Sequence, residues 1–263
     1  MKLPKYVGNV LVGATAVVFA GAKFLPNQQE AGPVLTAAVE FVTPSATPVE
    51  TGGVAELTEM ALSSLSGSVR KLSHSSALEN AFRSYFAYKS AHPKDVKKPY
   101  LYFVDYGLSA TTPRGYVFDM EALRVIDGPF MVAAGRGSAQ DGNGVPRTFS
   151  NRSGSAATSL GLYLTSNTYN FGGKSAGHHY TSIGLRLLGL SEGFNDNAYA
   201  RGVVAHGAPY VTSTRAGRSE GCPAMEQGRA KQLLPMLANG AMVFLFAPDA
   251  RWMQADPWVN QSM

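Results

Sequence analysis

The chain has 263 residues, of which 45% are hydrophobic and 16% are charged. This composition supports a folded core, and the 28 glycines favour a turn-rich β protein over a helical bundle. The net charge is +5, which falls to +3 without Lys2 and Lys5, and the sequence holds no lysine or arginine cluster, so we predict no nucleic-acid partner.

Residues 1–25 have the pattern of an export signal. Lys2 and Lys5 precede an apolar run over residues 7–22, which ends in the small residues Ala-Gly-Ala. The run is shorter than the ~20 residues that a membrane-spanning helix needs. We therefore expect an exported protein with a cleaved signal peptide, or alternatively an N-terminal anchor that contacts the membrane.

Three prolines predict a linker over residues 26–53. Apolar residues then recur at helical spacing, which predicts a helical N-terminal segment over residues 54–98. Its second helix is expected to begin near Ser76, where Ser76 and Glu79 fit a capping box. His92 precedes a proline and is expected to end that helix.

From residue 99 the pattern is that of strands. Short runs of aromatic and β-branched residues predict strands at 100–106, 114–120, 123–126, 130–134, 161–165, 180–188, 201–205 and 241–246. The glycine-rich segment 135–144 has no lysine at phosphate-loop spacing, so we interpret it as a wall of a substrate groove or a mobile connection. These elements predict a mainly β domain with a few short helices over residues 99–250, followed by a C-terminal tail at 251–263.

Cys222 is the only cysteine, and His206 follows a predicted strand. The thiolate is the reactive form of cysteine, so a catalytic site must lower the cysteine pKa or supply a base. Pro223 is suited to the first position of a helix, which would place Cys222 at the cap, where the helix dipole favours a thiolate. His206 becomes the base if residues 207–221 form a hairpin-like excursion.

Two glycines extend this hypothesis. Gly221 permits a positive φ, and its N–H and that of Cys222 could together form an oxyanion hole, while a carbonyl near Gly207 orients the imidazole. A lone cysteine is often a small buried hydrophobe instead. A zinc site that adds His178 and His179 is disfavoured because adjacent strand residues point in opposite directions, and we predict no metal and no cofactor.

Two motifs resemble a known family. The segments Arg201–Val211 (R-x-V-V-x-H-G-A-P-Y-V) and Gly217–Ala224 (G-R-S-x-G-C-P-A) resemble the L,D-transpeptidase (YkuD-like) catalytic domain, in particular its murein L,D-transpeptidase branch from Gram-negative bacteria. The resemblance spans about residues 100–247. It implies a YkuD-like β-sandwich catalytic domain in a periplasmic enzyme whose partners are peptidoglycan stem peptides.

The resemblance also implies residue roles. Cys222 would attack the carbonyl of the third stem residue, a meso-diaminopimelate, release D-alanine and pass the acyl group to an amine of a second stem, giving 3–3 or 1–3 cross-links. His206 would move the protons, oriented by the Gly207 carbonyl, and the N–H groups of Gly221 and Cys222 would stabilise the oxyanion. Four further residues are expected to contact the substrate: Ser219, Arg218, Arg201 and Tyr210.

The sequence departs from the more familiar family motif at two positions. Glu220 and Ala224 stand where that motif carries His and either Asn or Arg, so contacts made by those side chains do not carry over. Two other interpretations remain open. The first is an L,D-carboxypeptidase that uses water as acceptor, or another cell-wall cysteine peptidase with the same nucleophile. The second is a non-catalytic wall-binding protein. A carbapenem-type β-lactam is expected to acylate Cys222 if the thiol is catalytic.

Overall fold

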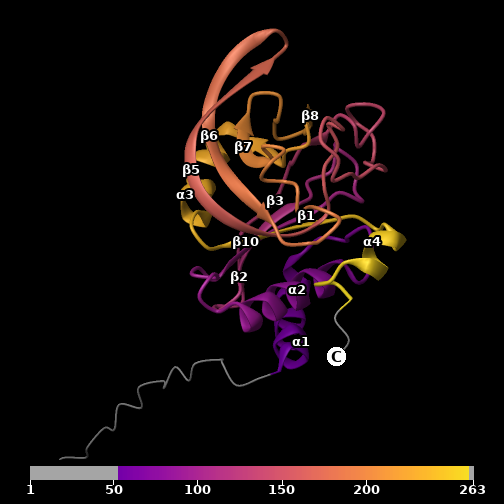
Figure 1. Cartoon of the computed structure of the whole chain (residues 1–263), viewed down its shortest axis with the longest axis vertical. Helices are drawn as coiled ribbons and strands as arrows, with labels where there is room; N and C mark the ends of the chain where they lie inside the picture. The colour runs from indigo at the N-terminus through magenta and orange to yellow at the C-terminus, as the bar shows by residue number, and fades with distance from the viewer. Residues whose placement is uncertain (1–52, 261–263) are drawn as a thin grey trace, which may run out of the picture. The chain divides into compact units, whose positions relative to one another are not determined.

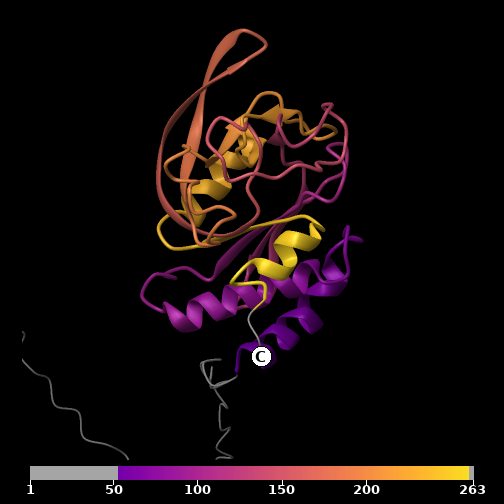
Figure 2. The same cartoon turned by 45° about the vertical axis from the view of Figure 1, so that its right-hand side comes forward.

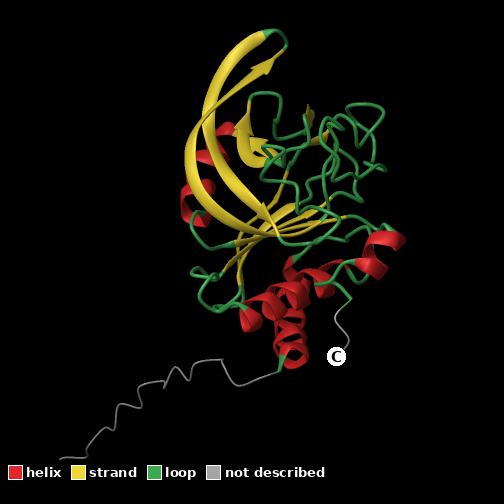
Figure 3. Cartoon of the chain, viewed as in Figure 1, coloured by secondary structure: helices red, strands yellow, loops and turns green. Residues whose placement is uncertain are grey.

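The computed structural model describes residues 53–260, so the predicted signal and the predicted linker up to residue 52 lie outside the described residues. Its helices are α1 (Val54–Leu65), η1 (Ser66–Ser68), α2 (Ala77–Ala91), α3 (Gln227–Leu237) and α4 (Ala250–Ala255). Its strands are β1 (Tyr100–Asp105), β2 (Gly115–Asp119), β3 (Arg124–Phe130), β4 (Ala134–Gly135), β5 (Gly161–Ser175), β6 (His178–Gly189), β7 (Val204–Ala208), β8 (Arg218–Ser219), β9 (Ala224–Glu226) and β10 (Met242–Phe246). The predicted mainly β fold with a few short helices and a preceding helical segment is confirmed (Figures 1 and 3).

The strands form a large mixed sheet and a small second sheet. The large sheet has eight strands in the order β3-β2-β1-β10-β5-β6-β7-β9, and the small sheet pairs β4 with β8. Neighbours are antiparallel except for β1 with β10, β7 with β9 and β4 with β8. The contacts of β1 with β10 and of β4 with β8 join segments that are distant in the sequence. The contacts of β4 with β8 and of β7 with β9 build the candidate site.

Helices pack against the large sheet in two places. The helices α1, α2 and α4 lie together on one side (Figure 2). There the ring of Phe82 meets that of Phe118 edge-on, with 5.4 Å between centroids. Helix α3 packs against β6 and β7. The central strand β10 is buried at every position, which explains why residues 242–246 read as a continuous apolar run instead of an alternating one.

The hairpin of β5 and β6 is much longer than the sequence predicts. We expected strands at 161–165 and 180–188, but the two strands run up to a turn at Ala176 and Gly177, both with positive φ (49° and 83°). Such two-residue turns match the twist of an antiparallel hairpin. The outer part of the hairpin is half-buried or exposed and arches away from the rest of the chain in Figure 1.

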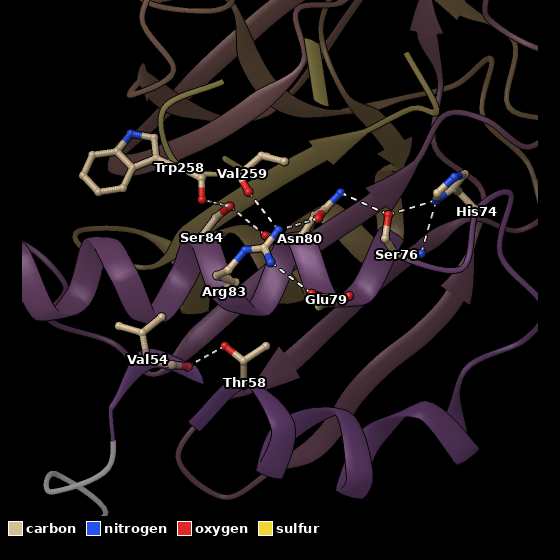
Figure 4. A network of polar contacts seen from close by, with 10 residues as sticks. All are labelled: Val54, Thr58, His74, Ser76, Glu79, Asn80, Arg83, Ser84, Trp258 and Val259. Atoms are coloured by element: carbon tan, nitrogen blue, oxygen red, sulfur yellow. Dashed lines mark hydrogen bonds and ion pairs between the residues drawn. The ribbon is translucent and has the colours of Figure 1, made fainter. Parts of the chain in front are cut away.

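The predicted capping box at the start of α2 is wrong. The helix begins after Ser76 as expected, but no side chain caps it. The Ser76 hydroxyl instead lies 2.9 Å from His74 Nδ1, and Glu79 binds Arg83 one turn later at 3.0 Å (Figure 4). The helix is therefore fixed by its buried face and by contacts with the end of the chain.

The predicted C-terminal tail contains ordered structure. Within residues 251–263 the helix α4 buries Trp252, and Arg83 and Ser84 of α2 donate hydrogen bonds to the carbonyls of Val259 (2.8 Å) and Trp258 (3.1 Å) (Figure 4). Trp252 also packs against Phe244 and Phe246 of β10, so this segment fastens the helical layer to the sheet. Within residues 53–260, every helix is too short or too polar to span a bilayer.

Candidate active site

The parallel pairing of β7 and β9 places the predicted base and the predicted nucleophile on neighbouring segments. His206 lies opposite Ala224 in this pair, and its N–H donates to the Pro223 carbonyl at 3.4 Å. Cys222 comes two residues before Ala224, at the start of the same parallel strand contact. His206 sits inside β7, one strand from the cysteine segment. The hairpin-like excursion that we predicted for residues 207–221 is wrong, because parallel neighbours require a crossover, which here passes through β8.

The predicted helix start beside the thiol is also wrong. Residues 224–226 form β9, and α3 begins at Gln227. Pairing with β7 therefore extends the chain after Pro223, and Cys222 does not cap a helix. The helix dipole cannot act on the thiol in the way that we predicted.

Burial controls the chemistry of His206. The ring is 3% exposed and stacks on Phe171 of β5, with 4.1 Å between centroids and 18° between planes. Its Nδ1 lies 3.1 Å from the Gly207 carbonyl oxygen, which can only accept, so Nδ1 carries the proton and Nε2 keeps its lone pair. Burial lowers the pKa of His206 to about 4, against an opposing contribution from the bond to Gly207. The imidazole is thus neutral at pH 7 and has the protonation state of a base.

The aromatic contact depends on a glycine between the two strands. Gly184 of β6 lies directly opposite His206, and a Cβ atom there would come within 2.7 Å of the Tyr169 ring. Without that atom, side chains from β5 reach across β6 toward β7. Phe171 was not predicted as a site residue, because its position in the polar outer part of the hairpin carries no strand signal.

Cys222 is a free cysteine and is half-buried. Burial raises the pKa of the Cys222 thiol, while a hydrogen bond from the Val204 N–H and the positive charge of Arg201 oppose this rise. The sulfur lies 4.0 Å from the Gly202 carbonyl oxygen, its hydrogen-bond acceptor among the described residues. The resting thiol is therefore protonated, and a proton must leave it before it can act as a nucleophile.

The turn before the cysteine is braced by Ser219. Its hydroxyl donates to the Cys222 carbonyl at 2.6 Å and accepts from the Gly221 N–H at 3.1 Å. Gly221 has φ +123°, and a Cβ atom there would meet the Ala157 carbonyl oxygen at 2.9 Å. The N–H that we predicted for an oxyanion hole is thus engaged within the turn, and Ser219 contacts the backbone. Among residues 53–260, no acceptor is bound to the Cys222 N–H, which is free to bind a substrate oxygen.

The thiol opens into a pocket of about 330 Å³. Arg201 does not point freely into this pocket, because its guanidinium donates to the carbonyls of Ser150 and Ala157, each at 2.8 Å, and to the hydroxyls of Ser155 and Ser159. It therefore holds the loop 150–159 in place and adds a positive charge near the sulfur. The pocket is lined by Arg136, Gly154, Ala156, Arg201, Gly202, Val203, Glu220 and Cys222.

An ion pair lies at this pocket. The Arg136 Nε is 2.8 Å and 2.9 Å from the two carboxylate oxygens of Glu220. The pair continues the parallel register of β4 and β8, in which Gly135 lies opposite Ser219 and the Arg136 N–H donates to the Ser219 carbonyl at 2.7 Å. Arg136 was not predicted as a site residue, although it lies in the glycine-rich segment 135–144, for which a groove wall was one of two interpretations.

Two predicted substrate contacts lie elsewhere. Arg218 donates to the carbonyls of Ala139 (3.5 Å) and Gln140 (3.3 Å), on the glycine-rich loop. Tyr210 packs edge-on against Tyr180, with 6.4 Å between centroids, beside a small apolar cluster. Neither residue lines the pocket at Cys222. Within the described part of the chain, no three His, Cys, Asp or Glu side chains gather as metal ligands would.

The family of the protein follows from a comparison with known families. Residues 70–246 match the model of the L,D-transpeptidase catalytic domain, which is well over half of the chain, so the protein belongs to this family. The match begins at residue 70, inside the helical segment, and not near residue 100 as we expected. The start of the match agrees with a helical layer that shares one core with the sheet.

Solved L,D-transpeptidases resemble the chain more distantly. One from Stackebrandtia nassauensis is 17% identical over 65% of this chain and 66% of its own, with a TM-score of 0.36. One from Mycobacterium smegmatis is 14% identical over 57% and 59%, with a TM-score of 0.34. The chain thus spans less than two thirds of either structure, and TM-scores this low support no statement about its site. No curated protein sequence matches the chain.

Proposed function

We propose that this protein is a peptidoglycan L,D-transpeptidase that works through a thioester on Cys222. The observation that carries the proposal is the pair of neighbouring parallel segments that hold a pocket-facing thiol and a neutral imidazole. Membership in the L,D-transpeptidase catalytic domain family supports the same reaction. The substrate class is the stem peptide of peptidoglycan, and the leaving group is D-alanine.

The first half of the reaction makes the acyl-enzyme. His206 Nε2 takes the thiol proton, and the sulfur attacks the carbonyl carbon of the third stem residue, a meso-diaminopimelate. The C–N bond to D-alanine then breaks, the leaving amine receives the proton from the imidazolium, and a thioester remains. The Cys222 N–H is a donor for the oxyanion, and the Gly221 N–H joins it only if it leaves the Ser219 hydroxyl.

The second half transfers the acyl group. An amine of a second stem loses its proton to His206 and attacks the thioester carbon, and the cysteine leaves as a thiolate that recovers the proton. Attack by water in place of the amine would give an L,D-carboxypeptidase. Which amine attacks determines whether 3–3 or 1–3 cross-links form.

We also propose that the protein is exported to the periplasm. The support is the lysine-flanked apolar run in residues 1–25, with either a cleaved signal or an N-terminal membrane anchor. A fusion of residues 1–25 to a reporter that is active only after export tests this proposal. An inactive fusion would exclude export by this segment.

Muropeptide analysis tests the enzymatic function. Incubation of the reduced protein with disaccharide-tetrapeptides should give cross-linked dimers and free D-alanine. The Cys222→Ala variant should give neither product, because no thioester can form. Accumulation of trimmed monomers without dimers would identify the carboxypeptidase, and unchanged substrate with the wild type would contradict both activities.

A further inference from the structure

We propose that Arg136 and Glu220 together recognise a zwitterionic amino-acid centre on the donor substrate, one that carries an ammonium and a carboxylate on the same carbon. This inference rests on the proposed function and adds a substrate contact to it. The donor residue that Cys222 would attack, meso-diaminopimelate, ends its side chain in such a centre. The geometry points to the ion pair as its binding site.

The first step is the position of the pair. Both residues line the same pocket as Cys222, and Glu220 precedes the cysteine by two residues. A pocket of about 330 Å³ lies at the small end of ligand sites, and holds one amino-acid residue more readily than a longer segment. A group bound there therefore belongs to the residue that meets the thiol.

The second step is the charge of the pocket. Its charged lining groups are Arg136, Arg201 and Glu220. Arg201 donates to four neutral oxygen atoms of loop 150–159 and is thus committed to the wall. The Arg136–Glu220 pair remains for a ligand, and it offers a fork of N–H donors and a carboxylate side by side. A carboxylate next to an ammonium is complementary to that arrangement.

The third step is the ease of opening the pair. The side chains of Arg136 and Glu220 are 61% and 72% exposed, and ion pairs this exposed contribute little stability. Their backbones, in contrast, are fixed, because Arg136 follows β4 and its N–H is bonded to the Ser219 carbonyl. Adding a Cβ at Gly135 would bring it within 2.2 Å of the Ala156 carbonyl oxygen, so the strand is packed closely against the opposite wall. A ligand can therefore replace the contact between Arg136 and Glu220 by one contact with each of the two side chains, without moving the backbone.

Binding to the full chain with Cys222→Ala tests the inference separately from catalysis. The probe is a stem tetrapeptide whose diaminopimelate end is free, N-acetylated or amidated, measured by calorimetry. We expect Glu220→Gln to weaken binding of the free-amine probe about 10-fold and to leave the N-acetylated probe unchanged. Arg136→Gln should do the same for the free carboxylate against the amide. The matched control is Glu121→Gln, which breaks an exposed pair with Lys89 on the other side of the molecule.

Two outcomes would overturn the inference. Equal affinity for all three probes in the Cys222→Ala protein with Arg136 and Glu220 intact would exclude recognition of the zwitterion. Equal changes for all probes in both variants would show that the pair merely closes the pocket. A failure of the proposed function looks different: the zwitterion then binds selectively, yet the wild-type protein with Cys222 releases no D-alanine.

Discussion

The two halves of the candidate site, the imidazole of His206 and the thiol of Cys222, have different surroundings. The imidazole of His206 lies in a strand and is enclosed by the sheet and by the ring of Phe171. The thiol of Cys222 lies on a turn, among backbone groups and the charged residues Arg201 and Glu220. The imidazole is 3% exposed, whereas the half-buried thiol lines a pocket.

This difference sets the resting state of the pair. Burial lowers the pKa of His206 to about 4 and raises the pKa of the Cys222 thiol, so both groups are neutral at pH 7. A preformed thiolate and imidazolium would need the opposite shifts. In the proposed reaction the proton must therefore pass from Cys222 to His206 during acylation, and the positive charge of Arg201 near the sulfur favours loss of the thiol proton. The following changes test each half in turn.

The largest effect is expected for the base. His206→Ala should slow acylation of Cys222 by a carbapenem-type β-lactam about 10²–10⁴-fold, because the thiol then loses its proton acceptor. Mass spectrometry of the adduct over time gives the rate. His179→Ala, on the exposed outer part of the hairpin, is the matched control and should react like the wild type. Normal acylation of the His206 variant would show that another group removes the proton.

The sequence predicted the parts of this site that are close in the chain or lie on apolar strands. Continuous burial of β1 and β10 gave clear strand signals, and the motifs around His206 and Cys222 identified both residues. The start of α3 was misplaced because pairing of β9 with β7 extends the residues that follow Pro223, although proline suits a helix start. At this position the strand pairing outweighs the preference of proline for the start of a helix.

The missed residues share a physical cause. Arg136 meets Glu220 across 84 positions of sequence, through a two-residue strand pair that leaves no periodic pattern. Phe171 lies among polar and glycine residues of a hairpin that is exposed on its outer part, so no alternation marks it. Both contacts arise from strand register, which single-residue patterns do not encode.

On the thiol side, the next largest effect is expected for Arg201. Arg201→Met should lower the free energy of unfolding by about 3 kcal/mol, because hydrogen bonds to Ser150, Ala157 and their neighbours are lost in a partly buried wall. Urea denaturation measures the change, with the exposed Arg152→Met as control. Acylation should slow as well, since the positive charge near the sulfur disappears. An unchanged free energy of unfolding together with slower acylation would show that Arg201 acts on the thiol and does not stabilise the loop.

On the imidazole side, Phe171→Ala should shift the pH profile. Removing the stacked ring admits water, so the pKa of His206 rises from about 4 toward the ordinary value of about 6.5. The base acts in its neutral form, so the acidic limb of the acylation rate moves to higher pH by up to about two units. The rate at pH 5 should fall while the rate at pH 8 stays unchanged. The control is Tyr100→Ala, at the start of β1 and several strands away from β7, which should leave the profile in place.

The lowered pKa of His206 also makes the free energy of unfolding depend on pH, and this dependence should be weaker in the Phe171→Ala variant. The folded pKa of His206 lies below the unfolded value, so between about pH 4 and pH 6.5 the unfolded chain binds more protons. The contribution of His206 to stability is therefore lost as the pH falls through this window. Parallel urea titrations at pH 4.5 and 7 measure it, and an identical slope in Phe171→Ala would contradict burial by that ring as the cause.

The smallest effect separates two roles for Ser219. If its hydroxyl braces the turn, Ser219→Ala should cost about 1–2 kcal/mol of stability, because the Cys222 carbonyl and the Gly221 N–H both lose their partner. KM for the stem peptide should stay unchanged in Ser219→Ala. If Ser219 bound the substrate, its loss would raise KM. Ser219→Thr keeps the hydroxyl and serves as the matched control. Ser219→Ala also frees the Gly221 N–H from its hydrogen bond. A faster acylation of Cys222 in this variant would show that the freed N–H reaches the oxyanion.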